Sequence, residues 1–271
     1  LMVLKALDDE SFGYYSWWAE AIYYAVENGA HVINMSMGGT STSSTLSDAV
    51  NHALANGVVV VACMMNANAN NMYYPAGIPG VIAVGSTDPD DTRSAPFFWS
   101  ATSGSNYGSH ISVVAPGNYA YGLSHTSNTN YNTYWGGTSQ AAPLVSGLAS
   151  LLLAQSPFLT PVEVRTIIET TAEDMVGELL EDTPGWDQYH GHGRVNAYRA
   201  LSGTVGMPTP QSQDAGLEVF PNPSMGEVRV HLPRHAQHLT AYDAHGRQVR
   251  SWAALKAEWI TLDLPGSGIY H

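Results

Sequence analysis

The chain has 271 residues, of which 44% are hydrophobic and 12% are charged, so it is long and apolar enough for one large domain plus a small one. Ten Lys and Arg residues against 23 Asp and Glu residues give a formal net charge of −13, which argues against a nucleic acid or an anionic membrane surface as partner. The single cysteine, Cys63, excludes an internal disulfide and gives no information on the redox compartment.

Strand-like and helix-like segments alternate over the first 201 residues. The expected strands are short apolar runs at residues 1–7, 31–37, 58–63, 81–86 and 111–117. The expected helices begin at Ser or Thr and cover residues 16–29, 43–57, 138–155 and 160–175. This alternation predicts an α/β domain over residues 1–201, with a mostly parallel sheet covered by helices on both faces. Its active groups are expected at the carboxyl ends of the strands.

Both ends of the chain have the pattern of an interrupted strand. Residues 1–7 read as part of an apolar strand and lack the features of a signal peptide, and residues 266–271 also read as a strand. No apolar run has the length needed to span a bilayer. We therefore expect a fragment of a longer protein, without a membrane span.

The composition changes after Leu201. Residues 202–216 are polar and contain Pro and Gly, which is typical of a linker. Residues 217–271 contain short alternating strands separated by turn signals, such as PNPSMG at residues 221–226. This pattern predicts a small all-β sandwich as a second domain.

A short polar turn places Thr138 and Ser139 in front of an almost wholly apolar helix. Ser or Thr at this position can cap the helix by accepting hydrogen bonds from free N–H groups. The same position suits a nucleophile, because a helix N-terminus carries partial positive charge and free donors for an oxyanion. The local pattern leaves both functions open.

Three blocks of sequence stand in the order typical of one enzyme family. Residues 137–143 (GTSQAAP) resemble the nucleophile motif of the subtilisin-like serine proteases. Residues 31–39 (HVINMSMGG) resemble their substrate-binding strand, and residues 58–66 (VVVVACMMN) resemble the strand that leads to the oxyanion-hole asparagine. The resemblance extends to about Leu201. It implies a serine endopeptidase that cleaves polypeptides through an acyl-enzyme, with an N-terminal propeptide as a further partner of the full-length protein.

The resemblance implies a role for each matched residue. Ser139 would be the nucleophile, and Asn66 would donate its side-chain amide to the oxyanion together with the Ser139 N–H. Thr138 would support this oxyanion hole or cap the helix, and Asn66 in isolation could be a turn residue. The residues expected to contact the substrate come from the same three blocks: Ser36, Met37, Gly38, Cys63, Met64, Met65 and Gly137. Among them, residues 36–38 match a segment that pairs with the substrate like an added strand, the alternative being an ordinary strand end.

Two departures from the family pattern concern the same region. Met64 and Met65 stand where the family usually has a small residue and a glycine, at positions that wall the pocket for the residue before the cleaved bond. Two thioether side chains could narrow or fill this pocket, or Met64 could point into the core. Gln140 replaces the methionine common after the nucleophile, and we expect this change to affect packing more than chemistry.

The matched region contains no complete catalytic triad. A serine hydroxyl needs a neighbouring base, and the base needs a carboxylate that orients it. In the family both come from segments that precede residue 1, and none of the eleven histidines lies in the family's histidine motif. The 271 residues alone are therefore expected to be inactive. The alternative is a catalytically degenerate subtilase fold that binds peptides or surfaces outside the cell.

Neither a cofactor nor a metal site is expected from the sequence. His190 and His192 have the spacing of a possible metal pair, but their place in the resemblance favours structural roles. Calcium is common in the family, and Asp88 matches a weak cation site of some members. We expect Asp88 to be a surface-turn residue instead.

Three segments of the tail share a second resemblance. Residues 219–232, 239–249 and 262–271 resemble the C-terminal sorting domain of proteins exported by the type IX secretion system. The alternative is a generic sandwich domain used for adhesion. The resemblance implies a bacterial protein that is secreted or held at the cell surface, with the type IX machinery as a partner.

Overall fold

The computed structural model describes residues 1–205 and five further strand segments, residues 218–220, 227–231, 238–242, 248–253 and 259–263. The chain divides into two compact units, Leu1–Met207 and Pro208–His271. Within the described residues, no helix is both long and apolar enough to cross a membrane.

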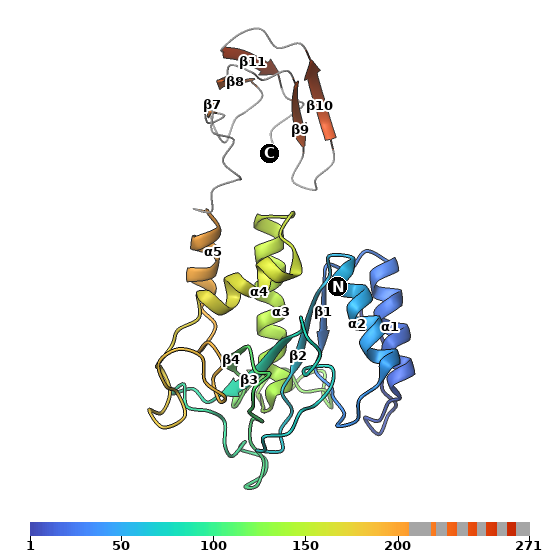
Figure 1. Ribbon diagram of the computed structural model, residues 1–271, viewed down its shortest axis with the longest axis vertical. Helices are drawn as coiled ribbons and strands as arrows, with labels where there is room; N and C mark the ends of the chain where they lie inside the picture. Colours follow the sequence, from blue (N-terminus) through green and yellow to red (C-terminus); the bar gives the residue numbers. More distant parts are fainter. Residues whose placement is uncertain (206–217, 221–226, 232–237, 243–247, 254–258, 264–271) are drawn as a thin grey trace. The chain divides into compact units, whose positions relative to one another are not determined.

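Four parallel strands form the sheet of the first unit (Figure 1). In the order in which they lie in the sheet, they are β1 (Val32–Met35), β2 (Val59–Cys63), β3 (Ile82–Thr87) and β4 (Val113–Pro116). Met35 pairs with Ala62, and Cys63 pairs with Val84, so the strands end close together at one edge of the sheet. Every residue of β2 and β3 is buried, as expected for strands covered on both faces.

Helices cover both faces of this sheet (Figure 1). On one face, α1 (Tyr15–Glu27) and α2 (Ser44–Ala55) share an apolar layer with the sheet. On the other face lie α3 (Thr138–Gln155), α4 (Pro161–Thr170) and α5 (Ala197–Val205). The predicted α/β architecture, a parallel sheet between two layers of helices, is confirmed.

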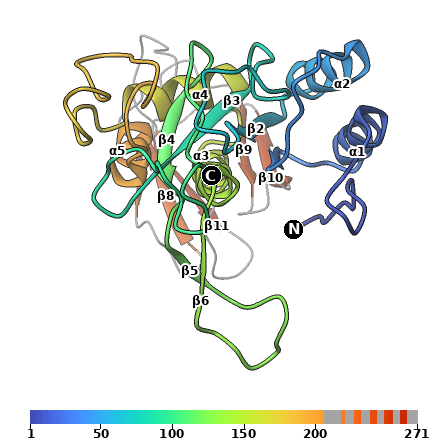
Figure 2. The same cartoon turned by 90° about the horizontal axis from the view of Figure 1, so that it is seen from below.

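Several boundaries differ from the sequence prediction. Residues 1–7 form no strand, because they pair with no other strand in the described part of the chain, although Ala6 packs into the apolar layer beside α1. The fourth expected helix ends at Thr170, where the chain turns so that Glu173 pairs with Arg194. A hairpin that the sequence analysis missed, β5 (Ala120–Gly122) and β6 (Thr133–Trp135), projects from the unit (Figure 2).

The end of α5 overlaps the start of the expected linker, and the second unit contains the segment expected to form a sandwich. Helix α5 continues to Val205, and residues 206–216 of the expected linker lie outside the described residues. In the second unit, β8 (Glu227–His231) pairs with β7 (Glu218–Phe220) and β11 (Trp259–Asp263), and β9 (His238–Tyr242) pairs with β10 (Gln248–Ala253). All of these pairs are antiparallel. Most residues that carry the second resemblance, including residues 221–223, 246–247 and 268–270, lie outside the described residues.

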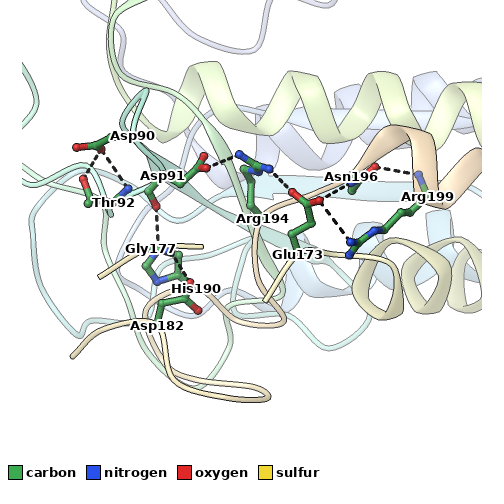
Figure 3. Close-up of polar contacts among 10 residues, drawn as sticks. All are labelled: Asp90, Asp91, Thr92, Glu173, Gly177, Asp182, His190, Arg194, Asn196 and Arg199. Carbon is green, nitrogen blue, oxygen red and sulfur yellow. Dashed lines mark hydrogen bonds and ion pairs between the residues drawn. The ribbon is translucent and has the colours of Figure 1, made fainter. Parts of the chain in front are cut away.

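Arg194 ties the segment after α4 to the rest of the first unit (Figure 3). Its guanidinium forms ion pairs with Asp91 and Glu173, and Asn196 Nδ2 donates to Glu173 Oε1 at 2.8 Å. The hydrogen bond from Arg194 is the main cause that holds the pKa of the Glu173 carboxyl below its usual range. The charged carboxylate of Glu173 therefore stabilises the folded state through its contacts with Arg194 and Asn196.

We expect Glu173→Gln to lower the thermal unfolding midpoint near neutral pH by roughly 2–4 °C, the shift that about 1 kcal/mol produces in a domain of this size. Because the pKa of Glu173 is lowered in the folded state, its ion pair stabilises the protein above the ordinary carboxyl pKa and is lost as the pH falls through the lowered value. The difference between variant and wild type should therefore shrink below about pH 4. Thermal melts across this range measure it. Glu20→Gln, exposed on α1 and without an ion pair among the described residues, is the control; equal losses in both variants would contradict the prediction.

Candidate active site

The candidate active site lies where the carboxyl ends of the strands meet the first turn of α3. Ser36 follows β1, Asn66 follows β2 by three residues, and Gly117 follows β4. Gly137 donates its N–H to the Gly117 carbonyl at 2.8 Å, which fixes the start of α3 against β4. Gly137 has a φ of 146°, and a Cβ there would lie 3.3 Å from Asn66 Nδ2, so only glycine fits well. The sheet thus brings three separate segments to Ser139.

Thr138 orients the side chain of Asn66. Its backbone N–H and its hydroxyl both donate to Asn66 Oδ1, each at 2.9 Å. With Oδ1 occupied, the remaining group of the amide is the Nδ2 donor, and the N–H of Ser139 makes no hydrogen bond within the described residues. No side chain caps α3, so Thr138 binds Asn66 and does not act as a helix cap. The arrangement leaves two donors for a developing negative charge.

The loop that carries Asn66 is held by backbone hydrogen bonds. Gly104 N–H donates to the Asn66 carbonyl at 3.1 Å, and Asn106 N–H donates to the Met65 carbonyl at 3.0 Å. Ala69 N–H donates to Asn106 Oδ1 at 3.2 Å. The amide of Asn66 is therefore positioned by a braced loop before any ligand binds.

Pro143 creates an unpaired carbonyl beside the candidate nucleophile. A proline has no N–H, so Pro143 cannot donate to the carbonyl four residues earlier, which is that of Ser139. Ser36 Oγ donates to this carbonyl at 3.0 Å instead. The break in the helical hydrogen bonding thus joins the first turn of α3 to the end of β1.

Asn34 and Ser146 extend this connection, and the sequence analysis did not identify them. Asn34 Nδ2 donates to Ser36 Oγ at 3.0 Å, and Ser146 Oγ donates to Asn34 Oδ1 at 3.0 Å. The chain of hydrogen bonds therefore leaves α3 at Ser139 and returns to it at Ser146. The sequence did contain one signal for this network: Pro143, four residues after Ser139, predicts that the Ser139 carbonyl needs a donor from outside the helix.

The Ser139 hydroxyl has no basic partner in the described part of the chain. Its Oγ donates to the Ser36 carbonyl at a long 3.4 Å, and no described histidine hydrogen-bonds it. The activating base that a serine nucleophile requires is therefore not among the described contacts of Ser139.

The segment after β1 presents free backbone groups. Within the described residues, neither Met37 nor Gly38 makes a backbone hydrogen bond, whereas Gly39 exchanges two with Tyr74, at 3.0 and 2.8 Å. Residues 36–38 are only partly buried. An extended peptide could pair with these groups as an added strand.

The side chains of Cys63, Met64 and Met65 have different surroundings. Met64 is fully buried in the layer shared with α1 and α2, which supports the core alternative and removes it from the expected pocket wall. Cys63 is 1% exposed on the opposite face, and burial raises the pKa of its thiol, against the opposing effect of the Thr138 and Ser139 hydroxyls. It lies beneath the site and not on its surface.

Met65 is the one partly exposed member of this trio. It has a φ of 69°, in the left-handed region that favours glycine. Its Sδ lies 3.1 Å from where a Cβ on Gly38 would be, so its thioether faces the segment after β1. Met65 therefore narrows the space beside residues 36–38.

The remaining candidates lie apart from Ser139. Asp88 accepts a hydrogen bond from Asn118 Nδ2 at 2.8 Å and belongs to a turn, as expected. The two histidines with metal-pair spacing have different partners. His192 lies 3.7 Å from the Glu169 carboxylate, whereas His190 is fully buried beside the Asp91 carbonyl.

Comparisons with known proteins identify the family of the chain. The sequence model described as the subtilase family, Peptidase S8, matches residues 1–193. The thermophilic serine proteinase of Bacillus sp. (strain AK1) is 39% identical over 202 residues, which cover 74% of this chain and 45% of that protein. Thermitase of Thermoactinomyces vulgaris is 38% identical over 203 residues, covering 74% of this chain and 64% of thermitase.

The fold is similar to that of solved proteases. A protease of Pseudoalteromonas arctica PAMC 21717 superposes with a TM-score of 0.55 at 32% identity, covering 70% of this chain and 59% of that one. A prenylagaramide maturation protease gives 0.59 at 28% identity, covering 72% and 69%. The matched region thus spans less than two thirds of both sequence relatives named above. Because the family model matches most of its length, the chain belongs to the subtilase family, and the relatives named above are serine proteases.

Proposed function

We propose that the protein cleaves polypeptides, with Ser139 as nucleophile and with Asn66 Nδ2 and the Ser139 N–H as oxyanion donors. The observation that carries this proposal is the pair of hydrogen bonds from Thr138 to Asn66 Oδ1, each 2.9 Å long. They leave Nδ2 as the free group of the amide beside the first turn of α3. A turn residue would not need its side chain fixed in this way.

The reaction follows from these groups. Ser139 Oγ forms a bond to the substrate carbonyl carbon, and its proton passes to a base. The two donors stabilise the negative oxygen of the tetrahedral intermediate, and the C–N bond then breaks as the leaving amine takes the proton. Water hydrolyses the resulting ester. We propose that the base and its orienting carboxylate come from polypeptide outside these 271 residues, because Ser139 contacts no histidine in the described part of the chain.

The substrate would bind as an extended strand along residues 36–38. The free backbone groups of Met37 and Gly38 support this placement, and Gly38 permits a close approach of the substrate backbone. Met65 would then restrict the side chain next to the cleaved bond. An N-terminal propeptide of the full-length protein would use the same strand site.

We also propose that the second unit is a sorting domain for type IX secretion, so that the protein is secreted or held at the cell surface. The support is the resemblance of residues 219–232, 239–249 and 262–271, together with the antiparallel pairing of the described strands of this unit.

In the protein translated from the complete reading frame, we expect Asn66→Ala to lower kcat by about 100- to 1000-fold with little change in KM, because one oxyanion donor is lost. Ser139→Ala should abolish both turnover and labelling by a fluorophosphonate probe. Asn71→Ala, an exposed change in the same loop, is the control and should leave kcat unchanged. Peptide binding that survives in a folded protein without any turnover or labelling would establish the degenerate, binding-only alternative instead.

We expect Met65→Gly to raise kcat/KM on the order of 10-fold for substrates with a large residue before the cleaved bond, because the thioether beside Gly38 is removed. Stability should change little, since glycine tolerates the φ of 69° while adding flexibility to the unfolded chain. Met64→Ala provides the contrast: it should lower stability by about 2–5 kcal/mol without changing specificity. Kinetics on a peptide series and thermal melts separate the two effects, and an unchanged preference in Met65→Gly would contradict the assignment.

Removal of residues 208–271 should abolish export from a host that carries the type IX machinery, while the first unit accumulates inside the cell. Immunoblots of medium, surface and cell fractions measure the distribution. Undiminished export of the shortened protein would overturn the sorting role and favour the adhesion alternative.

A further inference from the structure

Two carboxylates and an imidazole converge in the loop between α4 and α5. Asp182, Asp187 and His190 are 1%, 9% and 0% exposed, and each contributes one potential ligand atom to a group in which all three atoms lie within 4.8 Å of one another. Figure 3 shows His190 and Asp182 side by side below Asp91. None of the three hydrogen-bonds a described residue of the candidate active site, so the cluster needs an explanation of its own.

The hydrogen bonding of His190 leaves one ring nitrogen free. Its Nε2 lies 3.4 Å from the Asp91 carbonyl, which can only accept, so this contact is a hydrogen bond in the tautomer that places the proton on Nε2. The other nitrogen, Nδ1, is buried and has no partner among the described residues. Nδ1 is the nitrogen nearer to the main chain, where Asp187 Oδ1 accepts from the His190 N–H at 2.8 Å. A buried lone pair is unfavourable unless a donor or a cation pairs with it, and the neighbouring carboxylates offer no donor.

The two carboxylates are oriented by backbone donors. Asp182 accepts from Gly177 N–H at 2.7 Å, and Asp187 accepts from the N–H groups of Thr183 and Tyr189 at 3.0 and 2.7 Å. Outer contacts of this kind typically hold metal ligands in place, as does a histidine that donates its second N–H to a carbonyl. Asp187 Oδ2 and both oxygens of Asp182 accept one hydrogen bond each, so these three oxygens retain capacity for a further partner.

No basic side chain of the described residues neutralises these carboxylates. The nearby cations are engaged elsewhere: Arg194 pairs with Asp91 and Glu173, and Arg93 pairs with Glu181. Burial of unpaired charge is costly, whereas a divalent ion would balance two carboxylates.

We propose that Asp182, Asp187 and His190 bind a divalent transition-metal ion of the zinc type. One imidazole and two carboxylates suit zinc, whose bonds of about 2.0–2.2 Å would draw the three ligand atoms slightly together. Calcium fits less well, because it takes about 6–8 oxygen ligands and the cluster offers a nitrogen and two carboxylates. Asp187 also lines a surface hollow of about 520 Å³, which gives the ion a route in and leaves room for a water ligand.

The ion would stabilise the fold and take no part in peptide cleavage. Two backbone hydrogen bonds join the loop that holds the cluster to residues 108–112. His192 N–H donates to the Ser112 carbonyl at 2.9 Å, and Gly108 N–H donates to the Gln188 carbonyl at 2.8 Å. Metal binding would therefore fasten this loop to the segment that leads into β4.

The test uses the 271-residue chain, stripped with a chelator and dialysed against zinc or against calcium. We expect one equivalent of zinc by elemental analysis, a thermal midpoint that rises with zinc, and a cobalt-substituted form with the visible bands of a four-coordinate site. His190→Gln should weaken zinc binding by about 100-fold or more and remove the zinc-dependent rise. The matched control is His192→Gln, because the imidazole of His192 is 40% exposed and faces Glu169. This variant should keep both the zinc affinity and the zinc-dependent rise in the thermal midpoint.

A folded wild-type chain that binds no zinc overturns the proposal, whatever the variants do. Equal zinc binding in the two histidine variants also overturns it, and so does a calcium-only response that His190→Gln leaves intact. If His190→Gln fails to fold, Asp187→Asn replaces it, because the amide oxygen can still accept from the Tyr189 and His190 N–H groups, whereas the bond from Thr183 N–H and the negative charge are lost.

Discussion

The carbonyl of Ser139, which Pro143 cannot satisfy, is the constraint on which the active-site geometry depends. An unpaired buried carbonyl costs about 1–3 kcal/mol, and here the hydroxyl of Ser36 pairs with it at 3.0 Å. The same serine begins the segment proposed to bind substrate. The proposed nucleophile and the proposed substrate segment are thus joined by one hydrogen bond, which the hydrogen bonds of Asn34 to Ser36 and Ser146 extend.

The parallel sheet supplies the rest of the positioning. Because β1 and β2 end side by side, the segments that follow them reach α3 from one direction, and Asn66 arrives with its loop already braced. Met65 accepts a left-handed φ, which costs a non-glycine residue about 1–2 kcal/mol, at the position before Asn66. Because Met65 lies beside the segment proposed to bind substrate, this strained residue fits the proposed role in specificity better than a role in folding.

The layers of the fold and the position of the candidate site could be predicted from sequence patterns. Buried β-branched runs and helical segments define the α/β layers, and the motif around Ser139 predicts the segment proposed to carry the nucleophile. The orientations of Met64 and Met65 could not be predicted, because both faces of β2 are covered and an apolar pattern does not distinguish them. Pro143 predicts that the Ser139 carbonyl needs another donor, but it does not predict the contact of Asn34 with Ser146, which spans 112 residues. The sequence favoured structural roles for His190 and His192 despite their metal-pair spacing, but it did not predict that the two side chains contact different partners.

The two edge strands of the sheet differ in their backbone pairing: β4 is covered by another segment, whereas the segment after β1 is open. An unpaired edge strand is a liability, and β4 is covered: Val114 N–H donates to the Gly193 carbonyl, and Val195 N–H donates to the Val114 carbonyl, both at 3.0 Å. The Arg194 ion pairs hold this covering segment in place, and the proposed metal site would add to them. At the opposite edge, residues 36–38 keep free backbone groups beside Ser139. Closure of one edge protects the fold, and the open end of the other is where a substrate strand can add.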